Sequence, residues 1–178
     1  MPEGFRLVPA LQLDELASYH QDVEASLRLY FSPSNPTYDE RFVGRREDDV
    51  RQELKSRIEE SETRSALVLL TRLEASFKVD FDIRCKKRKK DPLSRHLREV
   101  KKKRKERVRL DEDILEGWKR HYPALSGAIG ELRGAFKVRH WLAHGRYRVP
   151  SPNYNYYSIR RIADGIINEF PLFKEGAV

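Results

Sequence analysis

Three side chains near residue 140 combine a permanent positive charge with two groups that can exchange protons. Residues 137–146 read Lys-Val-Arg-His-Trp-Leu-Ala-His-Gly-Arg, so Arg139, His140 and His144 lie close together. A histidine changes its charge near neutral pH and can donate or accept a proton, whereas an arginine stays positive and stabilises developing negative charge. This set of residue types is suited to acid-base chemistry on an anionic group such as a phosphate.

The residues before this set have the spacing of a helix that faces a protein core. Apolar residues recur three or four positions apart at Leu125, Ala128, Ile129, Leu132, Phe136 and Ala143. Arg139 falls on this apolar face, where a guanidinium requires an anionic partner. Gly145 predicts the helix end, which places His144 in the last turn, where the helix dipole favours its protonated form. We expect one helix over 123–144, with Arg139 and His144 about 140° apart around its axis.

The motif Val-Arg-His-Trp-Leu-Ala-His-Gly resembles the signature of the HEPN domain family, in which an arginine and a following polar residue precede a histidine. The resemblance covers residues from about 60 onward. It implies an antiparallel helical bundle that dimerises so that two motifs face one cleft. In many members it also implies metal-independent endoribonuclease activity, whereas other members only bind or interact. It implies catalysis by Arg139 and His144, with His140 orienting the site rather than transferring protons.

A second long helix is predicted over about 46–84, either continuous or in two parts joined near Ser61. One face of its second part carries Ala66, Leu69, Leu70, Leu73, Phe77 and Phe81. Glu74 borders this face, and we predict that its carboxylate neutralises Arg139 across the bundle. A solvated glutamate at a helix edge is the alternative.

Positive charge is concentrated in residues 84–109, which hold fifteen basic and three acidic residues, a net charge of +12 against +8 for the whole chain. Such a density repels itself, and contact with phosphates is its natural use, although a solvated tail is the alternative. Asp91-Pro92 divides the segment into two basic clusters, and His96 adds to the field. The residues predicted to bind RNA are Lys86, Lys87, Arg88, Lys89, Lys90, Lys101, Lys102, Lys103, Arg104, Lys105, Arg146 and Arg148.

The rest of the chain also predicts helices, so the fold class is all-α. Residues 1–45 are predicted to form an N-terminal helical extension, with a helix over 11–31 and a loop over 32–37, that packs on a bundle formed by 46–178. A short helix begins at Asp111 as its cap and ends at Tyr122-Pro123, with His121 in a structural role. A last helix is predicted over about 158–170, with Ile159, Ile162, Ile166 and Ile167 facing the core.

Several classes of protein are disfavoured by what the sequence lacks. The sequence contains no run of eighteen apolar residues, which a membrane-spanning helix would need. Cys85 is the single cysteine, so no disulfide can form within the chain, and we expect a cytoplasmic protein. Metal-ligand motifs, phosphate loops and nucleophile elbows are missing, so we expect no metal and no cofactor. Gly127, Gly130 and Gly134 would allow a neighbouring helix to approach closely, as at a dimer interface.

Two functions remain open on this evidence. The first is an endoribonuclease, such as a toxin or defence nuclease, that acts as a homodimer on RNA and has a protein antitoxin or inhibitor as a further partner. The second is a non-catalytic helical protein that binds nucleic acid through the basic segment and uses the Arg-His helix as an interface.

Overall fold

The chain forms helices throughout the residues that the computed structural model describes, which are 13–143 and 154–170. Seven α-helices and several shorter helical turns cover these ranges, and no strand occurs in them. The all-α class is therefore confirmed. None of the described helices has the length and apolar character needed to span a bilayer.

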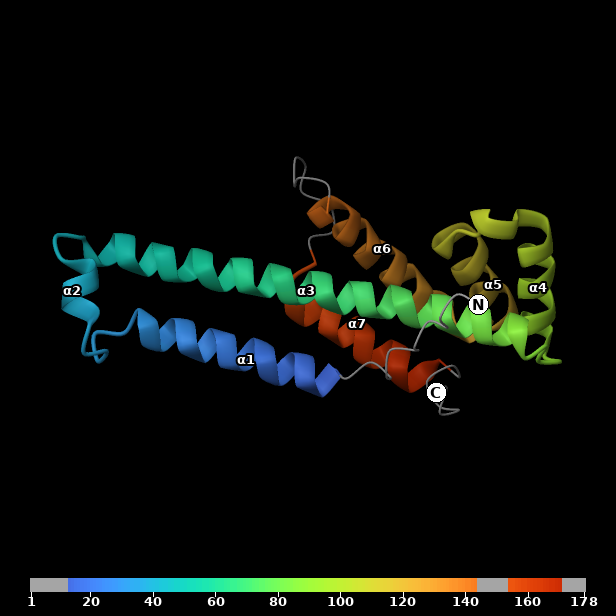
Figure 1. The fold of residues 1–178 in the computed structure, drawn as a ribbon, viewed down its shortest axis with the longest axis horizontal. Helices are drawn as coiled ribbons and strands as arrows, with labels where there is room; N and C mark the ends of the chain where they lie inside the picture. Colours follow the sequence, from blue (N-terminus) through green and yellow to red (C-terminus); the bar gives the residue numbers. More distant parts are fainter. Residues whose placement is uncertain (1–12, 144–153, 171–178) are drawn as a thin grey trace, which may run out of the picture.

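Helix α3, Glu47–Lys86, is the element on which the other helices pack (Figure 1). Its 40 residues form one uninterrupted helix, so of the two arrangements expected for this region the continuous one is observed. Three acidic residues in its first turn oppose the positive end of the helix dipole. Ion pairs one turn apart, such as Arg57 with Glu53 and Arg64 with Glu60, each 3.2 Å apart, follow along its solvated N-terminal half.

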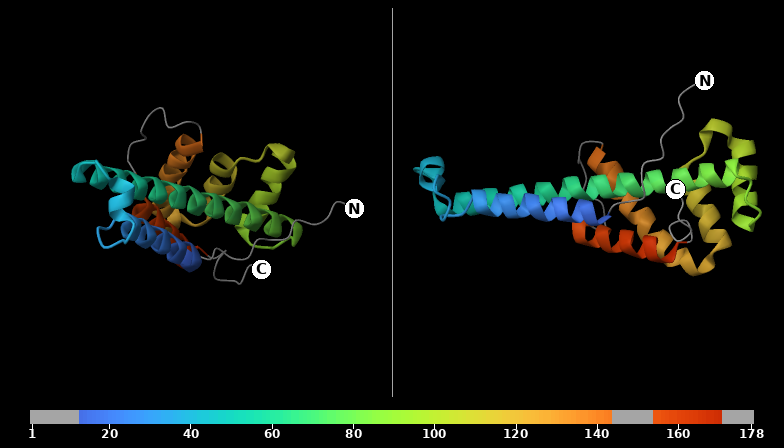
Figure 2. Two further views of the ribbon diagram at one scale, coloured as in Figure 1. Left: turned by 60° about the vertical axis from the view of Figure 1, so that its left-hand side comes forward. Right: turned by 60° about the horizontal axis from the view of Figure 1, so that its bottom comes forward.

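Helix α1, Leu13–Tyr30, runs antiparallel to the first half of α3 (Figures 1 and 2). The loop predicted over 32–37 is confirmed, but the short helix α2, Tyr38–Phe42, was not foreseen. Aromatic rings of Phe31 and Phe42 stack at 5.3 Å and close this end of the hairpin. We call residues 13–62, which comprise α1, α2 and the start of α3, the arm.

The remaining helices fold back on the second half of α3. They are α4, Pro92–Arg104; α5, Glu116–His121; α6, Ser126–Ala143; and α7, Tyr156–Glu169. Helix α4 crosses the far end of α3, as Figures 1 and 2 both show. The side chain of Asp91 caps α4 by accepting a hydrogen bond of 2.9 Å from the amide of Ser94, with Pro92 in the first turn.

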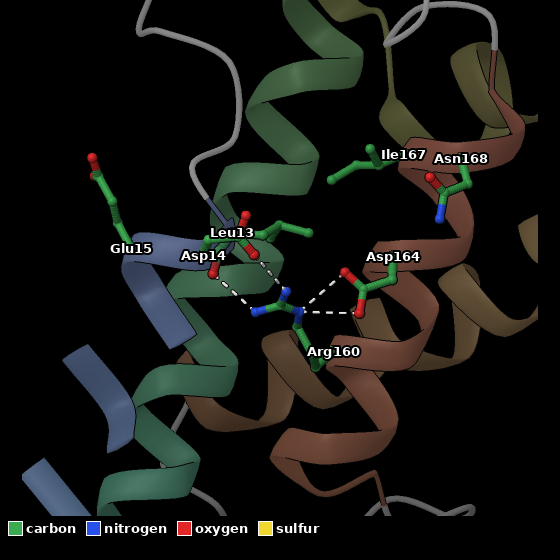
Figure 3. A pocket seen from close by; sticks show the side chains of 7 residues that line it. All are labelled: Leu13, Asp14, Glu15, Arg160, Asp164, Ile167 and Asn168. Atoms are coloured by element: carbon green, nitrogen blue, oxygen red, sulfur yellow. Dashed lines mark hydrogen bonds and ion pairs between the residues drawn. The ribbon is translucent and has the colours of Figure 1, made fainter. Parts of the chain in front are cut away.

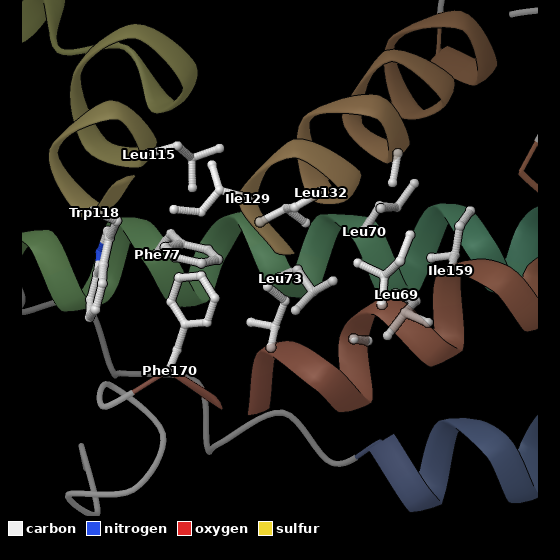
Figure 4. Close-up of a cluster of buried hydrophobic side chains, with 14 of the residues drawn as sticks. Leu69, Leu70, Leu73, Phe77, Leu115, Trp118, Ile129, Leu132, Ile159 and Phe170 are labelled. Atoms are coloured by element: carbon white, nitrogen blue, oxygen red, sulfur yellow. The ribbon is translucent and has the colours of Figure 1, made fainter. Parts of the chain in front are cut away.

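The core lies where α3, α5, α6 and α7 meet (Figure 4). Its largest fully buried side chains include Leu69, Leu70, Leu73, Phe77, Leu115, Trp118, Ile129, Leu132, Ile159 and Phe170. Burying one such side chain contributes about 1.5–3 kcal/mol, so this cluster supplies most of the stabilisation of the bundle. The apolar face predicted for residues 66–81 is the face of α3 that is buried here.

The start of the short helix after residue 109 differs from the prediction. Residues Leu110–Leu115 form a π-helical turn that leads into α5. Asp113, rather than Asp111, accepts the hydrogen bond from the first free amide, that of Arg109, at 2.8 Å. Asp111 instead forms an ion pair with Arg133 on α6. A sequence pattern identifies acidic residues near a helix start but does not tell which of two will turn back onto the backbone.

Candidate functional site

Arg139 lies one turn before the end of α6, on the side that meets α3. Its Nη2 atom is 3.1 Å from Oε2 of Glu74, which confirms the predicted ion pair between the two residues. The contact is between charges and is not an aligned hydrogen bond, since Oε2 accepts none among the described residues. The Glu74 side chain is 14% exposed and that of Arg139 is 35% exposed. The guanidinium is therefore anchored on one side and open to solvent on the other.

Glu74 is shared between two cations. Its Oε1 atom accepts a hydrogen bond of 2.6 Å from Nζ of Lys78, one turn further along α3. One carboxylate thus faces two positive groups, Lys78 and Arg139, and leaves one positive charge uncompensated within this set. A local excess of positive charge favours the binding of an anion.

The second member of the predicted catalytic set is also at the surface. His140 follows Arg139 directly and is exposed. Trp141, the next residue, is half-buried, and its indole N–H is buried without a hydrogen-bond acceptor among the described residues. His144, Arg146 and Arg148 lie outside the described residues, so their predicted roles remain predictions.

The face of α6 that packs on the core is shifted relative to the predicted one. Ile129 and Leu132 are buried as expected, as is Leu125 in the short helical turn Pro123–Leu125 before α6, and Ala135 and Val138 continue the buried face. Phe136 is only partly buried, and Arg139 lies at the edge of the face rather than within it. Ile129, Leu132, Ala135 and Val138 are spaced by three residues, and each such step turns the buried direction by about 60° around the axis, so the buried face winds around α6 and leaves Arg139 at its edge.

The three glycines of α6 have different surroundings. A side chain added at Gly127 or Gly130 would meet nothing within 4 Å, so these positions face open space. At Gly134 an added side chain would collide with the hydroxyl of Tyr154 from the segment before α7. Gly134 is therefore covered by its own chain, and only the first two glycines remain available for a dimer interface.

Arg84, the first cation of the basic segment, is a structural residue. Its side chain is 4% exposed; Nε donates to Asp80 at 2.7 Å, and Nη1 donates to Asp91 and Ser94 at 3.2 Å each. The guanidinium also lies 5.0 Å above the ring of Trp118. Burial raises the pKa of Asp80, and the charge of Arg84 opposes that rise. The density of positive charge in the sequence does not reveal that Arg84 is buried whereas neighbouring cations are exposed.

Two of the residues predicted to bind RNA are partly engaged within the protein. Lys101 pairs with Asp82 at 3.1 Å, and Arg104 pairs with Asp113 at 3.2 Å. Lys89 is half-buried and its carbonyl accepts from Arg98. The remaining predicted RNA-binding residues that the structure describes are exposed and form no ion pair with another described residue: Lys86, Lys87, Arg88, Lys90, Lys102, Lys103 and Lys105. These seven, together with Arg95, Lys119 and Arg120 on α4 and α5, are here called the basic end.

A pair of histidines was not foreseen at the basic end. The rings of His96 on α4 and His121 on α5 have their centroids 5.2 Å apart, at 54° to each other. The two residues are twenty-five positions apart in the sequence, and no local pattern predicts that they meet. Burial lowers the pKa of His96, and so do, in decreasing order, the neighbouring His121, Arg120 and Lys103.

A hollow of the described surface lies elsewhere, between the start of α1 and α7 (Figure 3). Its volume is about 290 Å³. Arg160 fills its centre, donating to the carbonyl of Leu13 at 2.9 Å and to Asp164 at 3.1 Å and pairing with Asp14 at 3.2 Å. These contacts join α7 to α1 and engage Arg160 within the protein. Within residues 13–143 and 154–170 no three histidine, cysteine, aspartate or glutamate side chains gather as a metal site would require.

Comparison with protein-family models, with curated proteins and with solved structures gave no match for this chain.

Proposed function

We propose that this protein is a metal-independent endoribonuclease of the HEPN type that acts as a homodimer. The observation that carries the proposal is the partly exposed guanidinium of Arg139, fixed by Glu74 near the end of α6 and followed by the exposed His140. The excess positive charge of this set supports an anionic substrate. His144, the residue directly after Ala143 in the sequence, supplies the second imidazole.

In the proposed reaction the RNA supplies its own nucleophile. The 2′-oxygen attacks the adjacent phosphorus while the bond from phosphorus to the 5′-oxygen breaks. His144 of one motif accepts the 2′-hydroxyl proton, and a second group, such as His144 of the other protomer, gives a proton to the leaving 5′-oxygen. Arg139 stabilises the negative charge that develops on the phosphorane oxygens. The products are a 2′,3′-cyclic phosphate and a 5′-hydroxyl.

Glu74 acts in this scheme by positioning Arg139. A long side chain that is one-third exposed has many rotamers, and a fixed carboxylate reduces their number before the substrate binds. His140 orients the site from the solvent side. A protein antitoxin or inhibitor that covers this surface would control such an enzyme.

The test is incubation of the purified protein with RNA in excess EDTA, alongside His144→Ala and Arg139→Ala. We expect the unmodified protein to cleave and to leave cyclic phosphate ends, and each variant to lose at least about a hundredfold in rate. Cleavage that is abolished by EDTA, or that survives both substitutions, would contradict the proposal.

A second function is supported by the seven exposed lysines and arginines of the 84–109 segment. They are exposed at the two ends of α4, and a protein that bound phosphates through them alone would be a non-catalytic nucleic-acid-binding protein. Binding of RNA that is unchanged in His144→Ala, with no cleavage in either protein, would favour this alternative.

A further inference from the structure

Helices α4 and α5 approach closely because residue 117 is a glycine. A side chain at Gly117 would meet Cδ2 of Leu97 at 3.1 Å and Cδ2 of His96 at 3.2 Å, tighter than ordinary packing. His121 lies one turn after Gly117 on the same side of α5, so the close crossing brings its ring against that of His96. The contact between the two imidazoles therefore results from the packing of two helices and not from the accidental placement of flexible surface side chains.

The histidine pair lies in a positive field. Lys103 and Arg120, both exposed, act on His96 from α4 and α5 and disfavour its protonation. One acidic group, Asp113 of the π-helical turn, acts on His96 in the opposite sense. Asp113 is buried and already occupied, since it pairs with Arg104 at 3.2 Å and accepts from the amide of Arg109 at 2.8 Å.

The imidazoles also lack a complete set of partners. The Nε2 atom of His121 is buried and has no hydrogen-bond partner among the described residues. Two adjacent imidazoles and two nearby cations thus provide N–H donors where α4 meets α5, whereas the one acidic group that acts on His96, Asp113, is already engaged. An anion with several oxygens would satisfy these donors and allow the imidazoles to take up protons.

We propose that His96, His121, Lys103 and Arg120 form a binding site for a backbone phosphate of RNA, separate from the Arg139 site. The choice of RNA as the polyanion rests on the proposed function, which the site deepens by giving the substrate a second point of attachment. Glu74 and Lys86 are twelve residues apart on α3, about 18 Å along the helix axis, and the histidine pair lies on α4 and α5, which follow that end of α3 in the chain. One RNA strand contacts both sites when it bridges the distance between them.

The binding test uses a 2′-O-methylated RNA, which cannot supply the attacking hydroxyl, in the presence of EDTA. Affinity is measured between 50 and 200 mM salt at pH 7.5 and at pH 5.5. One additional phosphate contact increases the loss of affinity over this salt range by about threefold. At pH 5.5 we expect the unmodified protein to show this additional loss of RNA affinity between 50 and 200 mM salt, and the variant His96→Gln/His121→Gln not to show it. At pH 7.5 we expect the affinities of both proteins to depend on salt equally.

The matched control is Lys55→Gln, which removes an exposed cation from the arm, where the side chain is 68% exposed. We expect this variant to behave like the unmodified protein at both pH values, whereas Lys103→Gln weakens binding. Equal effects of the two lysine substitutions would overturn the proposal, because the charge would then act without regard to place.

A second measurement needs no variant. Histidine proton resonances of the unmodified protein are followed through pH 5–8 with and without the same RNA. We expect the RNA to raise the pKa of His96 and to displace the ring resonances of His121 at the same time. Two outcomes would overturn the proposal: resonances of this pair that the RNA leaves unchanged throughout the pH range, or resonances that respond to zinc and not to RNA.

These measurements are independent of catalysis. If the protein cleaves RNA but the resonances of its histidine pair do not respond to RNA, only the second binding site is refuted. If the histidine pair responds to RNA but the protein never cleaves it, only the nuclease function is refuted.

Discussion

Arg139 is held by a carboxylate that it shares with Lys78. A guanidinium with no partner at the edge of a core would lose hydration without compensation, and a fully buried one would be closed to a substrate. Glu74, 14% exposed, anchors one side of Arg139 and leaves the other open. The pairing was predictable because a cation on an apolar face needs an anion and because Glu74 borders the facing helix. The sharing with Lys78, which leaves the excess positive charge, was not predicted.

Replacing Glu74 with glutamine tests this arrangement. The amide keeps the shape of the side chain and removes its charge, so Arg139 is no longer fixed. We expect the free energy of unfolding to fall by about 1 kcal/mol, as for a partly exposed pair, and the cleavage rate to fall by about tenfold or more. Urea denaturation and RNA cleavage assays measure the two effects.

Glu59→Gln is the control for this substitution, because Glu59 is 63% exposed and its contact with Lys55 is 3.9 Å long. We expect its unfolding free energy to stay within about 0.5 kcal/mol of that of the unmodified protein. If Glu74→Gln likewise left both the free energy of unfolding and the cleavage rate unchanged, the ion pair would contribute to neither stability nor catalysis.

His96 predicts a pH effect on stability. Its pKa in the folded protein is lowered, mainly by burial, from an ordinary value of 6.5. As pH falls below that value the unfolded chain binds the proton more readily, so the free energy of unfolding decreases, whereas above it both states are neutral. We expect the melting temperature of the unmodified protein to fall more between pH 7.5 and 5.5 than that of His96→Gln. Two parallel pH profiles in calorimetry would exclude this effect.

At the scale of elements, the junction of α3 with α4 depends on a buried cation. Arg84 connects Asp80 on its own helix to Asp91 and Ser94 at the start of α4, and its guanidinium covers Trp118 near α5. Several hydrogen bonds are needed to compensate the desolvation of a guanidinium, and here they come from two helices. The orientation of α4, and with it that of the basic end, therefore depends on this contact.

Substitution of Arg84 by methionine should expose this dependence. Asp80 would remain buried without its partner, and we expect the free energy of unfolding to fall by about 3 kcal/mol. The double variant Asp80→Leu/Arg84→Met should recover most of that loss, because no uncompensated charge is then buried. Chemical denaturation of both variants measures the free energy of unfolding. If the double variant remains as unstable as Arg84→Met, the loss comes from packing and not from an uncompensated buried charge.

The helices were more predictable than the contacts between them. The apolar faces of residues 66–81 and of the final helix, with Ile159, Ile162 and Ile166, identified buried residues because burial imposes a period that is visible locally. Helix α2 was missed because five residues between turn formers have no such period. The division of the basic segment into buried, paired and exposed cations, and the meeting of His96 with His121, depend on packing between helices, which no local spacing encodes.

For the whole molecule, the rigidity of α3 sets the distance between the Arg139 site, anchored by Glu74, and the start of the basic end. One uninterrupted helix carries Glu74 and also Lys86, at the start of the basic end. At about 3.4 Å per nucleotide, the separation of about 18 Å corresponds to five or six nucleotides of a strand. Substrates shorter than this reach the Arg139 site without reaching the basic end.

A comparison of RNA lengths tests this geometry. We expect Lys86→Gln/Lys87→Gln/Arg88→Gln to lower kcat/KM by about tenfold for a 20-nucleotide RNA and to leave that for a dinucleotide within about twofold of the unmodified value. Salt should reduce the first activity much more steeply than the second. An equal effect on both substrates would place the basic end within the reacting site itself.

The arm gives the molecule an electrical polarity along its longest axis. Residues 13–62 contain thirteen acidic and seven basic residues, whereas residues 84–109 carry a net charge of +12, and α3 holds the two groups at its opposite ends (Figure 1). Near a polyanion such a particle experiences a torque as well as an attraction, so it rotates until the positive end leads and the arm trails into solvent. Encounter with a nucleic acid would then be oriented before any side chain touches it, and the trailing arm would be the surface left free for a third molecule.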